Sequence, residues 1–493
     1  MTAASHKSLN WRILVPWSLS LLIGATGTLH GAESPIDSAR SELYATYAVE
    51  LATLADRCQK TGLDEQSKAI RRWLPKRESG KSHLFVLAEV RPLATPEKDA
   101  SAAQVECLTA WNRLRREQAA RLFKLAQKAI TAERISLAYE LVMEGAREDP
   151  INKKLRRLLG DQQANGRWVS SYAAGRLDRG FVDHPKFGWI LKTHVKRYEG
   201  GERRYKSRWL TAEKADEIMA GNLDRGWTIQ TQHYDIKTND AWERAVALGR
   251  RLERLHAVWR QVFVRYYAAD TEIRRLVTGR RPLRGGTKRH KVVFFRSRDQ
   301  YNAMLRKSQP RIEITLGIYF DHARTAYFFA GDDQNDTTLF HEATHQLFQE
   351  SRPVAHKIAQ DNNFWIVEGI ACYMESLTKA GGCYTLGGLE EGRVPAARVR
   401  LLEDGFYVPL AELTAMGMKP LQRDKRIAKL YSQSAGLTAF LMHSGDGRYR
   451  DATVNYLKKL YTNRVDANSL EKLTGTRFEE LDRQYHEYLK TRP

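Results

Sequence analysis

The chain has 493 residues, of which 42% are hydrophobic and 28% are charged. This composition is typical of a globular protein and excludes both a mostly membrane-embedded and a disordered one. With 80 Lys and Arg against 58 Asp and Glu, the formal net charge is +22. Such a charge favours contact with polyanions such as nucleic acid, anionic lipid or acidic envelope polymer. The basic residues are dispersed and accompany no nucleic-acid module, so a soluble basic surface is the preferred interpretation and specific nucleic-acid binding is not expected.

Residues 1–32 predict a cleaved signal peptide. Lys7 and Arg12 provide a positive start, Ile13 to Ala25 form an apolar core, and small residues follow. The core is short for a bilayer span and Pro16 interrupts it, which favours cleavage over anchoring. We therefore expect a secreted or periplasmic protein with no transmembrane segment after signal removal.

The remaining length predicts roughly two to four domains. Residues 33–165 read as a helical domain, interrupted near Pro92 and Pro96. Leu122 to Thr131 and Arg134 to Glu148 resemble one tetratricopeptide-like helical pair. A packing domain that supports the following one is the preferred interpretation, and a partner-binding module is the alternative.

Residues 166–226 predict a connector with a few short strands and one helix around Thr211 to Ala220. From residue 227 the pattern becomes strand, helix, strand, helix, hairpin and helix, up to residue 350. The expected elements are a strand at Trp227 to Thr238, a helix at Ala241 to Tyr267, a strand at His290 to Phe295, a helix at Ser297 to Leu305, strands at Thr315 to Phe320 and Ala326 to Ala330, and a helix capped by Asp336 or Thr337.

The last of these helices carries the motif H-E-x-x-H at His341, Glu342 and His345. Residues four apart on a helix lie on one face, so both imidazoles can reach the same ion. Glu342 then projects toward the same cavity without being a ligand. This is the arrangement of a zinc hydrolase, with two ligands and a general base for the metal-bound water.

A catalytic zinc site needs a third protein ligand from a separate element. Glu368 is the best candidate, because the apolar segment from Asn363 to Glu375 predicts a buried helix. A carboxylate on a buried apolar face is costly unless it is paired or bound to a metal. Gly369 weakens the helix and indicates a close backbone approach. Both features are explained if Glu368 faces the metal helix.

The longer pattern with a third histidine is absent, because Ser351 stands at that position.

The H-E-x-x-H motif and the later segment W-I-V-E-G-I-A-x-Y, which contains Glu368, resemble the gluzincin metallopeptidases, the clan of thermolysin and the aminopeptidase N type. The chain is most similar to the bacterial exported "peptidase MA-like" group. The resemblance covers about residues 227–493. It implies that His341, His345 and Glu368 bind one Zn²⁺ and that Glu342 activates water. It also implies an α/β half at residues 227–350 and a helical half at residues 351–493 that closes the cleft.

Three further features follow from the resemblance. Tyr431 lies at a distance from Glu368 that implies an oxyanion-stabilising role, with a core tyrosine as the alternative. Cys372 stands where thermolysin-like enzymes have an Asp that orients a ligand histidine, so that role is vacant or is met elsewhere. The strand at residues 327–330 occupies the place of an edge strand that pairs with substrate backbone.

Other polar residues are expected to be structural. His184, His233, His322 and His443 are predicted to be exposed or structural rather than ligands. The four cysteines leave two interpretations open: disulfides Cys58–Cys107 and Cys372–Cys383, or four buried thiols.

The sequence thus predicts an α+β, mostly helical protein: a helical N-terminal domain followed by a gluzincin-like metallopeptidase domain with a small mixed sheet. Its predicted function is that of an exported zinc metallopeptidase acting on a peptide or protein substrate. The alternative is a non-catalytic envelope scaffold with a vestigial or structural zinc site, which binds an anionic polymer or a protein partner.

Overall fold

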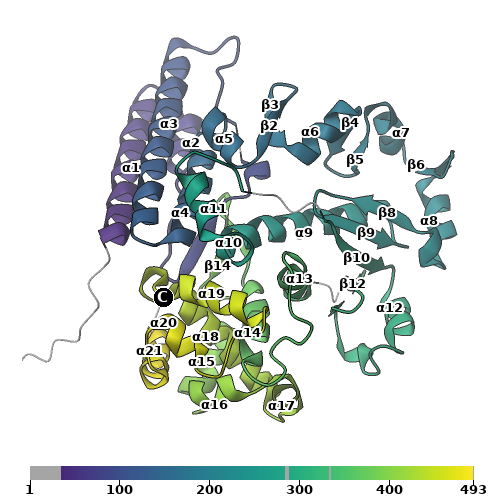
Figure 1. Ribbon diagram of the computed structural model, residues 1–493. Coiled ribbons are helices and arrows are strands. Elements are labelled where there is room, and N and C mark those ends of the chain that lie inside the picture. The colour runs from purple at the N-terminus through teal and green to yellow at the C-terminus, as the bar shows by residue number, and fades with distance from the viewer. Residues whose placement is uncertain (1–34, 91, 284–287, 332–334, 492–493) are drawn as a thin grey trace, which may run out of the picture.

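The computed structural model describes residues 35–90, 92–283, 288–331 and 335–491. The predicted signal peptide lies outside these residues. The fold is of the α+β class and mostly helical, as predicted, and its strands form small separate sheets. Figure 1 shows the N-terminal helices side by side, the C-terminal helices beneath them, and most strands toward the opposite side. Within the described ranges, no helix combines the length and apolar character needed to cross a bilayer.

Long helices pack side by side in the N-terminal part. The predicted helical pair near residues 122–148 is present, but its first helix is much longer than expected and begins at Ala102. Cys58 and Cys107 form a disulfide that joins the first and third helices, whereas Cys372 and Cys383 are separate buried thiols. Of the two interpretations left open, the disulfide therefore holds for Cys58 and Cys107, and the buried thiols hold for Cys372 and Cys383. The helices are α1 (Pro35–Lys60), α2 (Asp64–Arg71), α3 (Ala102–Thr131), α4 (Ile135–Glu148) and α5 (Lys153–Leu158).

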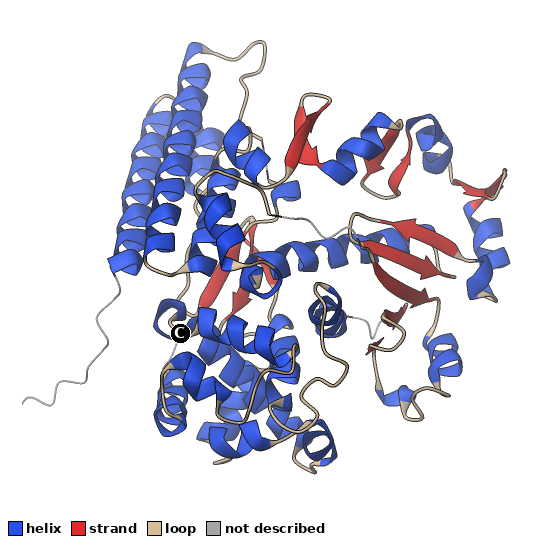
Figure 2. Cartoon of the chain, in the orientation of Figure 1, coloured by secondary structure: helices blue, strands red, loops and turns tan. Residues whose placement is uncertain are grey.

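The predicted connector is a series of β-hairpins, each followed by a helix (Figure 2). The second strand of each hairpin contains one tryptophan: Trp168, Trp189 or Trp209. This repetition was not predicted, although the Asn165-Gly166 turn with positive φ at both residues is a strong hairpin signal. The elements are β2 (Asp161–Ala164), β3 (Arg167–Ser170), α6 (Ser171–Asp178), β4 (Phe181–His184), β5 (Gly188–Leu191), α7 (Val195–Glu199), β6 (Glu202–Tyr205), β7 (Arg208–Thr211) and α8 (Ala212–Ala220).

The central mixed sheet has the strand order β11-β12-β10-β9-β8. Strands β9, β10 and β12 are parallel, and the two outer strands run antiparallel to their neighbours. The single strand expected at residues 227–238 is wrong, because the chain turns back at Thr231 to His233. The buried apolar residues are odd-numbered before the turn (Trp227, Ile229) and even-numbered after it (Tyr234, Ile236), and this change of phase across the polar residues 231–233 is the signal that was missed. The strands are β8 (Trp227–Gln230), β9 (Tyr234–Thr238), β10 (His290–Phe295), β11 (Ile318–Phe320) and β12 (Thr325–Phe329).

Helices cover both faces of this sheet. The apolar faces of α9 and α13 share one core with β10 and β12, and α12 packs against the other face through Tyr301 and Leu305. This order of elements was predicted from periodicity, which is strong in α9 because its apolar residues follow one stripe. The helices are α9 (Trp242–Val262), α10 (Val264–Tyr267), α11 (Asp270–Val277), α12 (Arg298–Leu305) and α13 (Asp336–Glu350).

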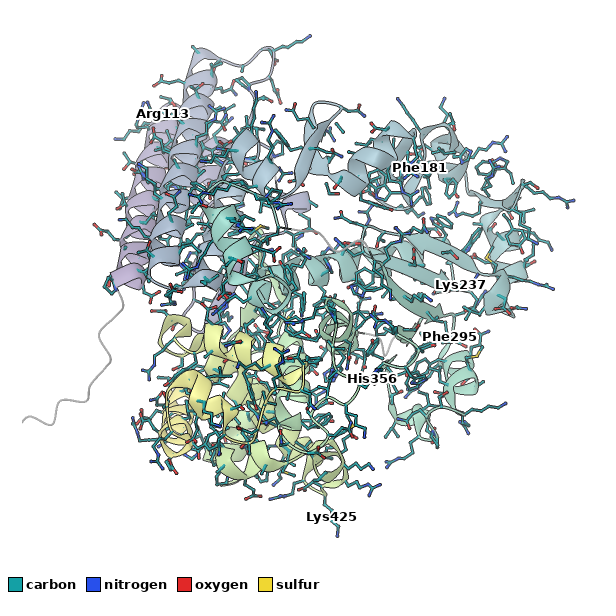
Figure 3. All side chains as sticks on the ribbon, in the orientation of Figure 1. Arg113, Phe181, Lys237, Phe295, His356 and Lys425 are labelled. Carbon is teal, nitrogen blue, oxygen red and sulfur yellow. A yellow bond between two sulfur atoms is a disulfide. The ribbon has the colours of Figure 1, made fainter. Side chains whose placement is uncertain are left out.

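The C-terminal part is mostly helical and includes a small sheet. That sheet has the order β1-β14-β13, so a strand from the N-terminal part, β1 (Lys81–Leu84), pairs with β14 (Cys383–Gly387). Figure 3 shows Arg113 and Lys425, both exposed, at opposite ends of the molecule, in agreement with dispersed basic residues. The remaining elements are α14 (Phe364–Met374), β13 (Thr378–Ala380), α15 (Val394–Leu402), α16 (Leu410–Ala415), α17 (Met418–Arg423), α18 (Ile427–Gly447), α19 (Arg450–Leu460), α20 (Ser469–Thr474) and α21 (Phe478–Lys490).

Candidate metal centre

The helix α13 presents both motif histidines on one face. The Asn335 side chain caps it by accepting a hydrogen bond from the Thr338 N–H at 3.1 Å. The predicted caps, Asp336 or Thr337, are therefore wrong by one or two residues. The opposite face is buried in the core against α9 and the sheet. Packing on one side and a cap at the start therefore fix the direction in which His341 and His345 point.

The structure brings His341, His345 and Glu368 together. The two Nε2 atoms lie 3.2 Å apart, and Glu368 Oε2 lies 3.5 Å from His341 Nε2 and 3.7 Å from His345 Nε2. Tetrahedral ligands about 2.1 Å from a zinc ion lie about 3.4 Å from one another. The three side chains are only 10–16% exposed. These residues, which the sequence predicted as ligands, can therefore hold one zinc-sized ion with little movement.

The pKa values of the side chains around the centre are strongly shifted. Burial alone would lower the pKa of His341, but hydrogen bonds between its ring and Cys372, Glu368 and Glu375 raise it well above its usual value. Burial alone would raise the pKa of Glu368, but His345 and His341 lower it. Without an ion, a proton on His341 thus balances the buried carboxylates. A bound cation would take over that role, because metal ligands must be deprotonated.

Glu342 faces the same centre without belonging to the ligand triangle. One of its oxygens, Oε2, accepts a hydrogen bond from the Tyr319 backbone N–H at 3.0 Å. Burial raises the pKa of Glu342, Glu368 raises it further, and the two histidines oppose both effects. A carboxylate with a raised pKa beside a metal site has the properties of a general base.

The strand that contacts Glu342 corrects one expectation. The strand expected at residues 327–330 corresponds to β12, which lies inside the sheet between β10 and β11 and cannot pair with a substrate. The edge strand is β11, which contains Tyr319. Its short length of three residues and the adjoining tight turn concealed it within the longer strand expected from Thr315.

A carboxylate that was not predicted orients the first ligand. His341 Nδ1 lies 2.8 Å from Glu375 Oε1, and Arg393 Nε donates to both oxygens of Glu375 at 2.8 and 3.0 Å. Ligand histidines commonly donate their second N–H to such a carboxylate. Cys372, at the position where an Asp was sought, lies 4.0 Å from the same nitrogen. The spacing of seven residues from Glu368, two helical turns, is the signal that could have identified Glu375; Arg393 gives no local signal.

Gly369 lets two helices approach closely. A Cβ atom at this position would lie 2.6 Å from Thr438 Oγ1 and 2.8 Å from the Ser434 carbonyl oxygen, both on α18. The close approach was predicted, but the interpretation that linked it to the metal helix is wrong, because α18 and not α13 is the neighbour. Glu368 therefore faces α13 while Gly369, one residue later, faces α18.

Tyr431 lies on α18 and is partly buried against the main core. Burial raises the pKa of its phenol, and the negative charges of Glu368 and Glu342 raise it further. The helix α18, which carries Tyr431, packs against α14, which carries Glu368. A neutral phenol in this place can donate a hydrogen bond.

The arrangement thus gathers three side chains that could hold a metal ion, a carboxylate with a raised pKa and an orienting carboxylate. The chain as a whole was also compared with known proteins. It matches neither a protein-family model nor a curated protein sequence.

Proposed function

We propose that the protein is an exported zinc-dependent metallopeptidase. The observation that carries this proposal is the ligand triangle of His341, His345 and Glu368, with edges of 3.2–3.7 Å, beside Glu342. The residue pattern of residues 1–32 supports export, and the resemblance of the two motifs to gluzincins supports peptide-bond hydrolysis.

The chemistry divides between the ion and the protein. Zinc, when bound, lowers the pKa of its water to about 7 and polarises a carbonyl group. Glu342 accepts a proton at Oε1, since Oε2 is engaged by the Tyr319 N–H, and later passes it to the leaving amine. Tyr431 donates a hydrogen bond to the oxyanion of the tetrahedral intermediate. Glu375 and Arg393 hold the His341 ring in one orientation.

The position of Glu342 also favours an enzyme over a non-catalytic scaffold. A structural zinc site takes four protein ligands, whereas this centre offers three and places a carboxylate beside them. Holding that carboxylate in a partly buried place raises its pKa and costs stability. A purely structural site has no need for it.

The test compares wild type with Glu342→Gln. We expect wild type to cleave a random peptide library with zinc bound, and the variant to be about 10²- to 10⁴-fold slower with its zinc retained. Cleavage products are read by mass spectrometry and zinc by elemental analysis. Glu313→Gln, the same change at an exposed position, is the matched control and should keep full activity.

Two results would overturn the proposal. Wild type with zinc bound at this centre could leave the library intact, or Glu342→Gln could cleave as fast as wild type. Salt-sensitive binding to an anionic polymer in the first case would favour the scaffold.

A further inference from the structure

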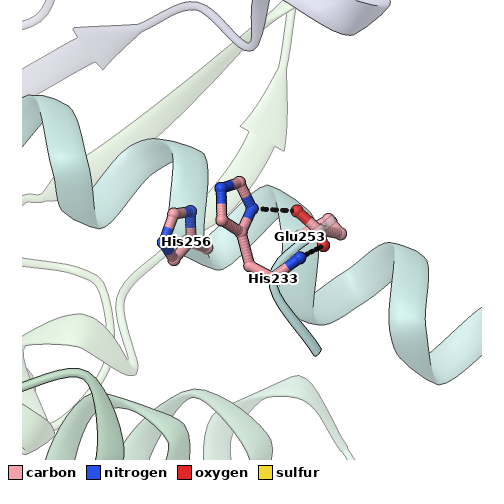
Figure 4. A group of neighbouring side chains, drawn as sticks. All are labelled: His233, Glu253 and His256. Atoms are coloured by element: carbon pink, nitrogen blue, oxygen red, sulfur yellow. Dashed lines mark hydrogen bonds and ion pairs between the residues drawn. The ribbon is translucent and has the colours of Figure 1, made fainter. Parts of the chain in front are cut away.

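A second group of histidine and glutamate side chains lies away from the candidate metal centre. His233 is in the turn between β8 and β9, and Glu253 and His256 are three residues apart on α9. Figure 4 shows the two imidazole rings face to face, with Glu253 on the far side of His233. The ring centroids of His233 and His256 are 3.7 Å apart, with an angle of 22° between planes. This group shares no residue with the first centre.

His256 is the unusual member of the group. It is 5% exposed, and within the described residues its ring nitrogens make no hydrogen bond. Its ring contacts are with other rings: the face of His233, the edge of Tyr234 and, at 6.2 Å, His290. Neither ring nitrogen is among the fully enclosed polar atoms that lack a partner, so the ring keeps some contact with solvent. The ring nitrogens of His256 thus retain the capacity to bind a ligand.

Glu253 holds His233 in a fixed orientation. Its Oε2 lies 2.7 Å from His233 Nδ1, and its Oε1 accepts the His233 backbone N–H at 2.7 Å. The other ring nitrogen, Nε2, is left with the Gln232 amide at 3.3 Å. A carboxylate on one nitrogen of a histidine, with the other nitrogen exposed to a ligand, is the usual arrangement around a bound metal.

We propose that His233 and His256, supported by Glu253, bind a divalent transition-metal ion of the zinc type at a second site. Each residue can offer one ligand atom within 4.8 Å of the others. Tetrahedral ligands of zinc lie about 3.4 Å apart, so the stacked rings must rotate until one nitrogen of each points at the same ion. Two imidazole donors select zinc, nickel or copper over calcium or magnesium, which prefer oxygen.

An ion can reach this site from solvent. The side chains of His233 and Glu253 are 22% and 26% exposed, whereas His256 forms the buried side. A bound ion would tie the β8–β9 turn to α9. The group also borders α13, because His290, next to His256, lies 2.9 Å from Glu350, the last residue of that helix.

The test counts zinc ions on the full-length protein after chelator treatment and equilibrium dialysis against zinc chloride. We expect two ions on wild type, one on the double variant His341→Ala/His345→Ala, and none on the triple variant that adds His233→Ala. His322→Ala, in an exposed turn, replaces His233→Ala in the matched control, which should keep one ion. Cobalt substitution of the His341→Ala/His345→Ala variant gives a second measurement, since nitrogen ligands produce visible absorption bands that the added His233→Ala change should remove.

The double variant separates this site from the proposed peptidase centre. One ion on both wild type and the double variant would support the second site and overturn the first. No ion on the double variant, or equal binding with and without His233, would overturn the second site. Circular dichroism checks folding. If a variant at His233 unfolds the turn, Glu253→Gln serves in its place, because it keeps the shape of the side chain, and it should weaken zinc binding.

Discussion

The two histidine and glutamate groups use the same residue types in different geometries. At the first centre, the rings of His341 and His345 are 4.9 Å apart at 77°, and their Nε2 atoms converge to 3.2 Å. At the second, the rings of His233 and His256 stack at 22°. Crossed rings aim their lone pairs at one point, whereas stacked rings aim them along parallel lines. The first group is ready for an ion, and the second must rotate.

The supports of the two groups differ as well. The first is held by two packed helices, with Arg393 fixing the carboxylate that orients His341. The second depends on a turn and on Glu253, which is already occupied with His233. Only the first has a carboxylate outside its ligand triangle, Glu342, that can move a proton. Under the two proposals, rigid and convergent support distinguishes the proposed catalytic centre from the proposed binding site.

Glu368→Gln should have the largest effect at the first centre. It removes the charged ligand, and zinc affinity should fall by roughly 10³-fold, since each ligand of a zinc site contributes several kcal/mol. Peptide hydrolysis should be lost with the metal. Zinc titration with a competing chelator measures the change. Glu253→Gln should leave the affinity of this centre unchanged; an equal loss from both variants would show that the two groups are not independent.

Tyr431→Phe should separate chemistry from binding. We expect kcat to fall by about 10²- to 10³-fold, because a lost oxyanion donor acts in the transition state. KM and zinc content should stay near the wild-type values. A normal kcat in this variant would support the alternative, in which Tyr431 is a core tyrosine and its replacement lowers stability instead. Steady-state kinetics together with thermal unfolding distinguish the two.

The local pattern predicted the elements that hold the first centre. Strong periodicity indicated α9, β10, α13 and α14, and an isolated carboxylate in an apolar helix pointed to Glu368. The β13–β14 hairpin was missed although Gly381-Gly382, both with positive φ, separates its strands and is a recognised turn signal. The sequence therefore contains enough information to predict this hairpin.

Other features could not be predicted because they depend on tertiary contacts. The strand β1 finds its partner β14 about 300 residues later, and no local pattern specifies such a pair. Arg393, which binds Glu375, lies at the N-terminus of a different helix, α15. His233 was predicted to be structural or exposed, and only the fold reveals that its turn lies against His256 on α9. Candidate metal ligands on one helix can thus be predicted from the sequence, whereas candidate ligands that meet only through a turn cannot.

Glu375→Gln should have an intermediate effect. The amide can still accept from His341 Nδ1–H but carries no charge, so zinc affinity should fall about 10- to 100-fold. Hydrolysis should recover when excess zinc is added, which separates this positioning role from that of Glu342. Glu390→Gln, an exposed change nearby, is the control and should have no effect. Unchanged affinity in Glu375→Gln would show that helix packing alone orients His341.

A buried histidine without a carboxylate beside it gives the most gradual effect, because it is spread over several pH units and is smallest near pH 7. His443 hydrogen-bonds the Tyr373 hydroxyl at 2.8 Å, and burial, followed by Arg450 and His83, lowers its pKa to about 3. The unfolded chain binds this proton near pH 6.5, so the folded state is fully favoured above that pH and loses stability as the pH falls toward 3.

The loss should amount to about 1.4 kcal/mol per pH unit in this window. Urea unfolding of wild type and His443→Gln between pH 4 and 7 measures it. The variant should show a shallower dependence of unfolding free energy on pH, because Gln does not titrate. His322→Gln, an exposed histidine, should match the wild-type slope. The pKa of His341 is raised and that of His443 is lowered, and the difference would then follow from the presence or absence of carboxylates beside a buried imidazole. Parallel slopes for wild type and His443→Gln would refute that explanation.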